Sequence, residues 1–485
     1  MNPWYIVIAK QTMKGNIPMD MITQAFKLFL KSACTILTSG SLSDFGSKMA
    51  LIQTAGNTMV TSILPHLISQ VDDVISQDPK RKKNWETVRM DRRVLTTSIG
   101  ELHFQRRYYQ HKQTKERAYL LDEELGIQAN AKVNGDVRQR TVELASQQSY
   151  LKSAQAATTS SLSRMSACNY VGDLKNFPAL EAQGERRVVK QLYVEADEDH
   201  VSLQDGKKIM VKLVYIHEGI KQEGKRRSLV NPRYLTSPLE DSPDKLWEKV
   251  SDYIGKQYDT EALETIFLSG DGAPWIRTGE DWLYPCIPIL DSFHVMKALR
   301  QLCGGKQDRI NAFLSYVHKN ELNRAEALCE DILKETPEPR RERKLKQSHY
   351  LLNNWLRILN QNYPGAQGCS AEGHISHILS ERLSSRPLGW SKKNMMNISQ
   401  LRIMSANGQT ICYEDLRRTK EEGKIACESG KGSELLNKTH LNKNLKRKIQ
   451  SSLQNMCRNL PVLEYAATTP LYQALHGLSY DTLAC

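Results

Sequence analysis

The sequence lacks closely paired cysteines, a long apolar run and any internal repeat. Its ten cysteines stand singly with no C-x-x-C pair, and a chain of 485 residues is too long for a disulfide-stapled miniprotein. The apolar run near the start, WYIVIA, is far below the roughly 20 residues that span a bilayer and too short for the core of a signal peptide. We therefore expect a cytoplasmic protein with reduced cysteines and no membrane partner.

The chain is long and basic. A single hydrophobic core rarely serves 485 residues, so about two to four domains are expected. The formal net charge is +13 and the sequence pI is about 9.1, which favours a polyanionic partner because each neutralised phosphate releases counterions. A basic protein with an ordinary solvated surface is the simpler alternative.

The first part of the chain predicts helices followed by a hairpin. Residues 1–90 carry apolar residues at helical spacing. Within 91–175, β-branched and aromatic residues flank a turn at residues 99–101, and two or three short helices follow. These helices favour either a helix-turn-helix DNA-binding region or a plain helical connector. Residues 106–109, RRYY, can face a nucleic-acid backbone or belong to an ordinary basic hairpin face.

Residues 187–400 predict an α/β domain. Two strands joined through Gly206, a helix, two further strands and another helix follow in the order of a ribonuclease-H-like core. An α-helical insertion is expected at about residues 300–365, between the second strand pair and the segment SAEGHISHILSERL. A basic C-terminal region, 401–485, completes the chain with the string LNKNLKRKIQ.

Three acidic residues stand in settings that suit metal binding. Asp197 ends the run LYVEAD, Asp271 ends IFLSGD between two glycines, and Glu372 opens a helical pattern. Strand ends are where α/β sheets present reactive groups, and carboxylates are the ligands that Mg²⁺ or Mn²⁺ prefer. Two such ions support in-line phosphoryl displacement, which indicates cleavage or transfer of nucleic-acid strands. Glu195 and Asp199 compete with Asp197, although strand alternation favours Asp197.

Two further motifs accompany these acids. Asp291 and His294 lie three apart at a strand-to-helix junction, where the imidazole can contact a phosphate or orient a metal ligand, or where Asp291 simply caps a helix beside a surface His294. Ser370 is expected to cap the helix that Glu372 opens. On the same helix Arg382 and Arg386 are assigned to DNA phosphates, with surface salt bridges as the alternative.

Taken together, these motifs resemble a known protein family, the ISLre-type bacterial insertion-sequence transposases, which are distantly similar to Mutator-like transposases. The strings that carry the resemblance are YVEADEDHV, LSGDGAPWI, LDSFHVMK and CSAEGHISHILSERLSSRPLGWS. The resemblance implies a DDE catalytic set at Asp197, Asp271 and Glu372 in a ribonuclease-H-like fold with a helical insertion. Asp291 and His294 match the C/D-x-x-H motif of the Mutator-like group.

The resemblance also implies an activity and partners. Such a protein binds the terminal inverted repeats of its element, cuts the ends with water as nucleophile, and joins the 3′ hydroxyl to target DNA with two Mg²⁺ or Mn²⁺ ions. It works as a homo-oligomer on DNA, associated with the bacterial nucleoid. The alternatives are a ribonuclease-H-like endonuclease without strand transfer and an inactive, transposase-derived DNA-binding protein.

Overall fold

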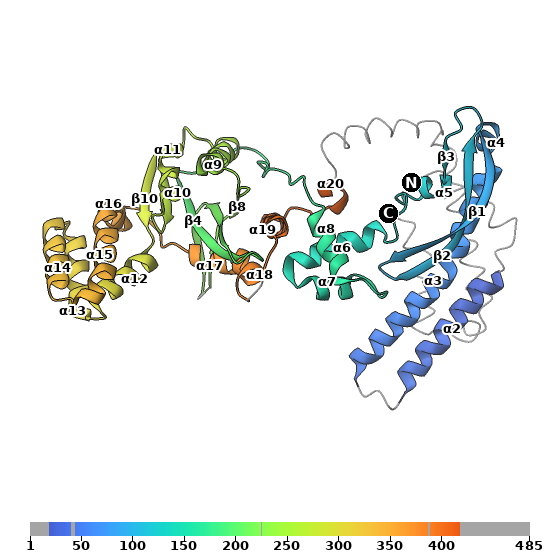
Figure 1. Ribbon diagram of the computed structural model, residues 1–485, viewed down its shortest axis with the longest axis horizontal. Coiled ribbons are helices and arrows are strands. Elements are labelled where there is room, and N and C mark those ends of the chain that lie inside the picture. The colour runs from blue at the N-terminus through green and yellow to red at the C-terminus, as the bar shows by residue number, and fades with distance from the viewer. Residues whose placement is uncertain (1–18, 40–43, 225, 387–388, 418–485) are drawn as a thin grey trace. The chain divides into compact units, whose positions relative to one another are not determined.

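The computed structural model describes residues 19–39, 44–224, 226–386 and 389–417, which form an α/β protein of two compact units (Figure 1). Of the described residues, those within 19–141 and 151–164 belong to unit 1, and those within 142–150 and 165–417 belong to unit 2. Two predicted features, the run WYIVIA and the basic string LNKNLKRKIQ, lie outside the described residues.

Unit 1 combines a helical hairpin with a β-hairpin. Its elements are α2 (Met19–Thr38), α3 (Phe45–Gln77), α4 (Pro79–Asn84), β1 (Trp85–Thr97), β2 (Gly100–His111), β3 (Arg117–Ala118) and α5 (Leu120–Glu124). Helices α6 (Gly135–Gln147) and α7 (Tyr150–Ala157) contribute residues to both units. The expected helices, hairpin and following short helices are thus confirmed, with the hairpin strands starting earlier than predicted.

Helix α3 organises unit 1. Its start is fixed by Asp44, whose carboxylate accepts hydrogen bonds from the Gly46 and Ser47 amides, as expected of an N-cap aspartate. Its second half packs on β2, where Leu102 and Phe104 alternate with exposed residues and are buried. One face of the hairpin therefore belongs to the core of unit 1.

Most residues of the RRYY string of β2 have protein partners in this core, which disfavours the alternative of a free nucleic-acid contact. Arg106 is 7% exposed and forms an ion pair with Asp122. Arg107 pairs with Asp72 at 2.8 Å and Asp73 at 2.7 Å. Tyr109 is fully buried. Charged groups this far from water need partners, which the neighbouring acids supply.

Unit 2 is built around one mixed sheet. Its strands are β4 (Gln191–Ser202), β5 (Lys208–His217), β8 (Arg233–Leu235), β9 (Thr265–Gly270) and β10 (Cys286–Leu290), in the order β10-β9-β4-β5-β8. Strands β4, β9 and β10 are parallel, whereas β5 is antiparallel to both β4 and β8. The predicted antiparallel pair is confirmed, with Gly206 in its turn at φ +80°. A short hairpin, β6 (Ile220–Glu223) with β7 (Arg226–Leu229), extends from β5.

Helices cover both faces of this sheet. They are α8 (Arg164–Gly172), α9 (Pro243–Gln257), α10 (Pro274–Arg277), α11 (Gly279–Trp282), α17 (Ala371–Ile375), the π-helical turn η2 (Ser376–Ser380), α18 (Glu381–Leu383), α19 (Lys392–Ala406) and α20 (Tyr413–Arg417). Alternate β4 residues Leu192, Val194 and Ala196 pack in one core with α9. On the opposite face, Leu213 and neighbouring strand residues pack with η2 and α19.

The predicted helical insertion forms a separate core beside β10 (Figure 1). It consists of α12 (Ser292–Cys303), α13 (Gln307–His318), α14 (Leu322–Lys334), α15 (Glu338–Asn353), α16 (Trp355–Leu359) and the 3₁₀ turn η1 (Asn360–Asn362). The string TPEPRRERKLK opens α15 because its second proline occupies the first helical turn, where a missing amide hydrogen costs nothing.

Two negative findings apply to the described residues. None of their helices is long and apolar enough to cross a membrane. The cysteines within the described ranges are all free thiols.

Candidate metal centre

The first two predicted acids lie on neighbouring strands near the carboxyl end of β9. Asp271 directly follows β9, as predicted, whereas Asp197 lies within β4, which continues to Ser202, so the expectation that Asp197 ends its strand was wrong. Strands β4 and β9 are parallel, and their last paired residues are Glu195 and Ser269, so Asp197 and Asp271 each follow two residues later. Adjacent strands are about 4.8 Å apart, which brings two residues far apart in the sequence into proximity. The alternation of β4 also holds, because Ala196 packs in the core beneath the other face.

The loop that carries Asp271 depends on its two glycines. A Cβ atom at Gly270 would come within 2.8 Å of the Ala196 carbonyl oxygen, and Gly272 has φ +80°. The first allows close approach of the two strands, and the second turns the chain. Asp271 then accepts a hydrogen bond from the Ala273 amide at 2.8 Å, and Tyr350 of the insertion donates to its carbonyl oxygen at 2.7 Å.

Asp291 and His294 follow β10 in different roles. Asp291 is the N-cap of α12, and its carboxylate accepts from the Phe293 amide at 3.1 Å. The plain capping alternative is therefore correct for Asp291. His294 sits in the first turn of α12 and is half-buried rather than on the open surface.

Glu372 is brought to the same place by α17, which contacts β4. Ser370 occupies the N-cap position and Glu372 lies in the first turn, as predicted, although the Ser370 side chain makes no capping hydrogen bond. The buried side chains of Ile375 and Leu379 hold the helix on the sheet, as the apolar pattern predicts, while Glu372 stays exposed.

Asp197, His294 and Glu372 converge. Each offers one ligand atom, and these atoms lie within 4.8 Å of one another. Asp197 accepts one hydrogen bond, from the Glu198 amide at 2.8 Å. Among the described residues, neither the His294 ring nitrogens nor the Glu372 carboxylate have a hydrogen-bond or ion-pair partner. The three side chains thus bring their ligand atoms together, and those of His294 and Glu372 have no hydrogen-bond or ion-pair partner among the described residues.

The electrostatics of the cluster favour a cation. Burial, opposed by the Glu198 amide and His294 and aided by the Asp271 and Glu372 carboxylates, raises the pKa of Asp197 to about 6. Crowded carboxylates repel one another unless a positive charge lies between them. Two carboxylates and an imidazole form a donor set that first-row divalent cations accept, so the residues present fit a metal ion.

A buried network beneath the cluster centres on Glu195, which sequence reasoning treated only as a rival to Asp197. One carboxylate oxygen lies 2.9 Å from His217 Nε2, and the other accepts from Tyr215 and from the Ser370 amide at 2.6 Å. Burial alone would raise the pKa of Glu195, but the hydrogen bonds from His217 and Tyr215 outweigh it and hold the pKa below its usual range. Glu195 therefore fastens the start of α17 to β4.

The pairing register of the β4–β5 hairpin could have predicted this network from the sequence. Glu195 pairs with Tyr215 across β4 and β5, and Tyr193 pairs with His217. Counting outward from the turn at Gly206 places an acid, a tyrosine and a histidine on one sheet face, and buried polar groups in such a position need one another as partners.

The remaining predicted residues lie elsewhere or have other partners. Asp199 is 6% exposed and accepts from Ser384 at 2.8 Å. Arg382, assigned to DNA phosphates, is instead buried, where it donates to the Ala145 carbonyl at 3.0 Å and stacks on Trp390. Its aliphatic stem and planar head suit packing against an aromatic ring. Arg386 is exposed, as predicted.

We expect Asp197→Asn to stabilise the metal-free protein above pH 6 and to abolish stabilisation by Mn²⁺. A raised pKa means that the folded chain holds the proton more tightly than the unfolded chain. The ionised group therefore costs stability above about pH 6, and this cost vanishes as the pH falls towards its ordinary pKa of 3.8. Allowing for partial exposure, the cost is about 2 kcal/mol. Thermal unfolding at about pH 8 and about pH 4.5, with and without Mn²⁺, measures both effects.

Asp199→Asn is the matched control, because Asp199 lies on the same strand face two residues later. It should keep the full response to Mn²⁺. The reverse result, with Asp199→Asn losing the response and Asp197→Asn keeping it, would make Asp199 the first acid.

The fold and the cluster define an α/β protein with a site of carboxylate and imidazole groups at the central strand of a mixed sheet. Residues 48–420 match a family described as an uncharacterised protein family, UPF0236. The chain belongs to the UPF0236 family.

Several relatives share most of this chain. A UPF0236 protein of Caldanaerobacter subterraneus subsp. tengcongensis is 32% identical over 475 residues, which is 96% of this chain and 99% of the relative. A second from the same bacterium is 32% identical over 417 residues, covering 85% of this chain and 87% of the relative. A Streptococcus gallolyticus protein, named for the vanSb 3′ region, is 25% identical over 398 residues, 78% of this chain and 85% of its own length.

Proposed function

We propose that this protein is a metal-dependent DNA transposase of the DDE class, which binds the terminal inverted repeats of its insertion sequence and cleaves and joins DNA strands. The observation that carries the proposal is the convergence of Asp197, His294 and Glu372, with Asp271 on the adjacent strand. Three side chains from three separate elements, β4, α12 and α17, meet beside the end of β9 although the sequence separates the first from the last by 175 residues.

The sheet supports a ribonuclease-H-like core. In chain order, three antiparallel strands (β4, β5, β8) are followed by two strands (β9, β10) added parallel to β4 on its other side. This is the arrangement that the transposase resemblance implies, with the first acid on the central strand, the second after its parallel neighbour and the third on a following helix. The insertion α12–α16 falls between the second and third acids.

The chemistry follows from what each residue can do. Two divalent ions, Mg²⁺ or Mn²⁺, would supply the positive charge that activates the attacking oxygen and stabilises the leaving oxygen. Asp197 and Asp271 would hold them from the sheet, and Glu372 and His294 from the two helices. Water and then the freed 3′ hydroxyl would act as nucleophiles activated by these ions, so that a covalent protein intermediate is not required.

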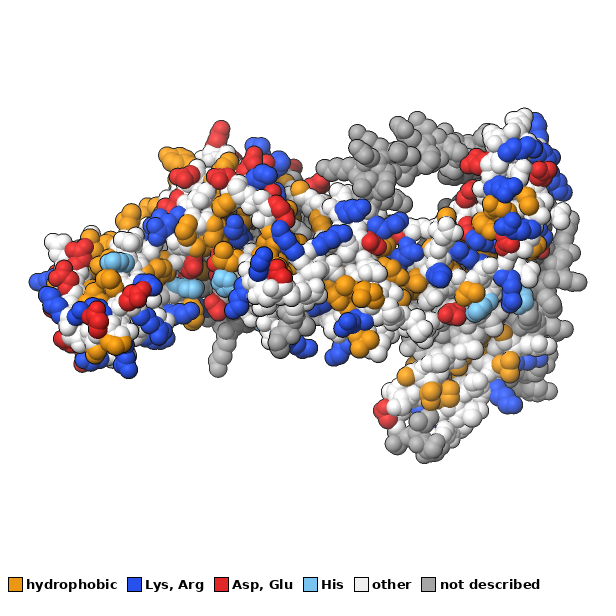
Figure 2. Space-filling view, in the orientation of Figure 1, with side chains coloured by type: hydrophobic (Ala, Val, Ile, Leu, Met, Phe, Trp, Pro, Cys, Tyr) orange, Lys and Arg blue, Asp and Glu red, His pale blue; other side chains and the backbone are white. Residues whose placement is uncertain are grey.

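Unit 1 has an exposed basic surface that suits DNA binding. Figure 2 shows lysine and arginine side chains gathered over the part of unit 1 that carries α4 and the β-hairpin. The exposed members include Lys80, Lys82, Lys83, Arg89 and Arg92. Such a basic surface supplies sequence-independent attraction to the phosphate backbone.

The relatives add support of another kind. The name of the second Caldanaerobacter relative joins eleven gene designations of one organism. A protein that recurs at many positions in a genome is what repeated transposition of its gene would leave behind.

A joining assay tests the proposal. The full chain is mixed with Mn²⁺ or Mg²⁺, a target plasmid, and labelled precut duplexes copied from the inverted repeats that flank its gene. We expect labelled products longer than the substrate, because joining adds plasmid DNA to the labelled end. Cleaved but unjoined DNA would instead indicate an endonuclease, and bound but unprocessed DNA an inactive DNA-binding protein. Either result would overturn the proposal.

A further inference from the structure

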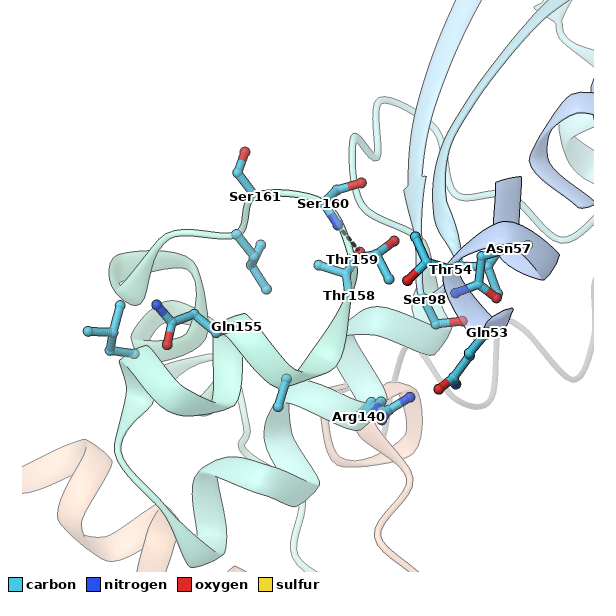
Figure 3. Close-up of a pocket in the computed structure, with 14 residues that line it drawn as sticks. Gln53, Thr54, Asn57, Ser98, Arg140, Gln155, Thr158, Thr159, Ser160 and Ser161 are labelled. Carbon is cyan, nitrogen blue, oxygen red and sulfur yellow. Dashed lines mark hydrogen bonds between the residues drawn. The ribbon is translucent and has the colours of Figure 1, made fainter. Parts of the chain in front are cut away.

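Unit 1 contains a groove of about 740 Å³ that belongs to neither the metal centre nor the basic hairpin surface (Figure 3). It is formed by one side of α3, the turn between β1 and β2, helices α6 and α7, and the loop that follows α7. Representative lining residues are Gln53, Asn57, Ser98, Arg140, Gln155 and Thr159. These five elements come from three separate parts of the sequence but share one concave surface.

The lining is mostly polar, with Ile99, Leu151, Ala156 and Leu162 as its apolar members, and its described residues carry no negative charge. Figure 3 labels ten side chains that are all hydroxyls or amides except for Arg140, and no aspartate or glutamate is among the described residues that line the groove. Arg140 is exposed and forms no ion pair with any described residue. The carboxylate of Asp136, close in sequence, is occupied by the Ser98 amide at 3.0 Å and the Val137 amide at 2.8 Å.

This composition selects one class of ligand. Arginine, serine, threonine, asparagine and glutamine side chains are those that contact phosphate and sugar groups of DNA. Apolar side chains at the edge, including Leu151 at 48% exposed, can pack against deoxyribose. No phenylalanine, tyrosine or tryptophan lines the groove among the described residues, so stacking on unpaired bases is not available there.

We infer that this groove binds the sugar-phosphate backbone of duplex DNA without reading its sequence. The inference rests on the proposed function, which makes DNA the substrate, and it assigns a second DNA contact to unit 1 beside the basic hairpin surface. Arg140 neutralises a phosphate, while the surrounding hydroxyl and amide groups donate hydrogen bonds to phosphate oxygens.

A charge series at Gln155 tests the inference with little risk to folding, because this side chain is exposed on α7. Binding of a short random-sequence duplex is measured by fluorescence anisotropy at several salt concentrations. Gln155→Lys should steepen the slope of log affinity against log salt by about 0.9, because one more phosphate is neutralised, and Arg140→Ala should flatten it by about the same amount. Gln155→Glu should weaken binding about five- to tenfold.

Gln24 supplies the matched control. It is an exposed glutamine of unit 1 on α2, outside both the groove and the basic hairpin surface, so Gln24→Lys and Gln24→Glu change the net charge equally. These variants should shift affinity less than about twofold. If the Gln155 and Gln24 series behave alike while the wild type still joins DNA ends, the groove inference fails and the proposed function stands. A wild-type chain that binds no DNA at any salt concentration overturns both.

Discussion

Asp271→Asn should reduce strand cleavage by about 10³-fold or more while leaving DNA affinity unchanged. The asparagine keeps an oxygen for the Ala273 amide, so the loop should hold its shape, but it removes the negative charge next to Asp197. A loss of several kcal/mol of charge stabilisation corresponds to this factor, since each 1.36 kcal/mol is tenfold in rate. Single-turnover cleavage and a binding titration on the same duplex measure the two quantities.

Asp259→Asn is a close control for that substitution. Asp259 also accepts a hydrogen bond from the amide two residues later, here Glu261 at 3.0 Å, and it lies in unit 2 but outside the cluster. Its cleavage rate should stay within about twofold of the wild type. Cleavage by Asp271→Asn at the rate of Asp259→Asn would remove Asp271 from the catalytic set.

Glu195→Gln should destabilise unit 2 and loosen the helix that carries Glu372. The amide cannot accept from His217 on one side and from Tyr215 and Ser370 on the other, so a buried donor loses its partner. Breaking such a buried network costs about 2–4 kcal/mol. We expect faster hydrogen exchange across residues 371–383 and weaker Mn²⁺ binding, measured by mass spectrometry and by calorimetry well below the melting temperature.

Glu218→Gln distinguishes this positioning effect from general destabilisation. The Glu218 side chain is 9% exposed and is held by Arg187 and Asn231 at another part of unit 2. Its substitution should lower stability without changing exchange in 371–383 or Mn²⁺ affinity. Equal effects of the two variants on hydrogen exchange in residues 371–383 would show that Glu195 does not specifically position α17.

Local patterns predicted the strands and the acids well because each is encoded over a few residues. The alternation of a β-strand in LYVEAD places Asp197 on the sheet face opposite to that of Ala196. The glycines on either side of Asp271 predict a turn, and Gly272 adopts the positive φ that glycine tolerates without strain. The apolar positions Ile375 and Leu379 likewise identify the buried side of the helix after Glu372.

The residues whose roles the sequence did not predict depend on distant partners. Arg382 was assigned to DNA phosphates and Arg106 was a candidate contact, yet both are buried. Their partners, the Ala145 carbonyl and Asp122, are brought to them by packing that no local pattern specifies. Ser370 fits an N-cap by sequence, but its amide and hydroxyl donate hydrogen bonds to Glu195, which is 175 residues away along the chain. A charged or hydroxyl side chain needs a hydrogen-bonding or charged partner if it becomes buried, but the sequence does not identify that partner.

The docking of the insertion gives it a part in aligning the acids. Tyr350 holds the Asp271 backbone, and Asn354 accepts from Arg277 while lying against Gly272, so α15 and its end brace the loop that follows β9. Helices α13 and α14 make no such contact within the described residues. Relatives can therefore vary in length at the α13–α14 tip with little penalty, whereas a deletion that removed α15 would leave the second carboxylate without its outer support.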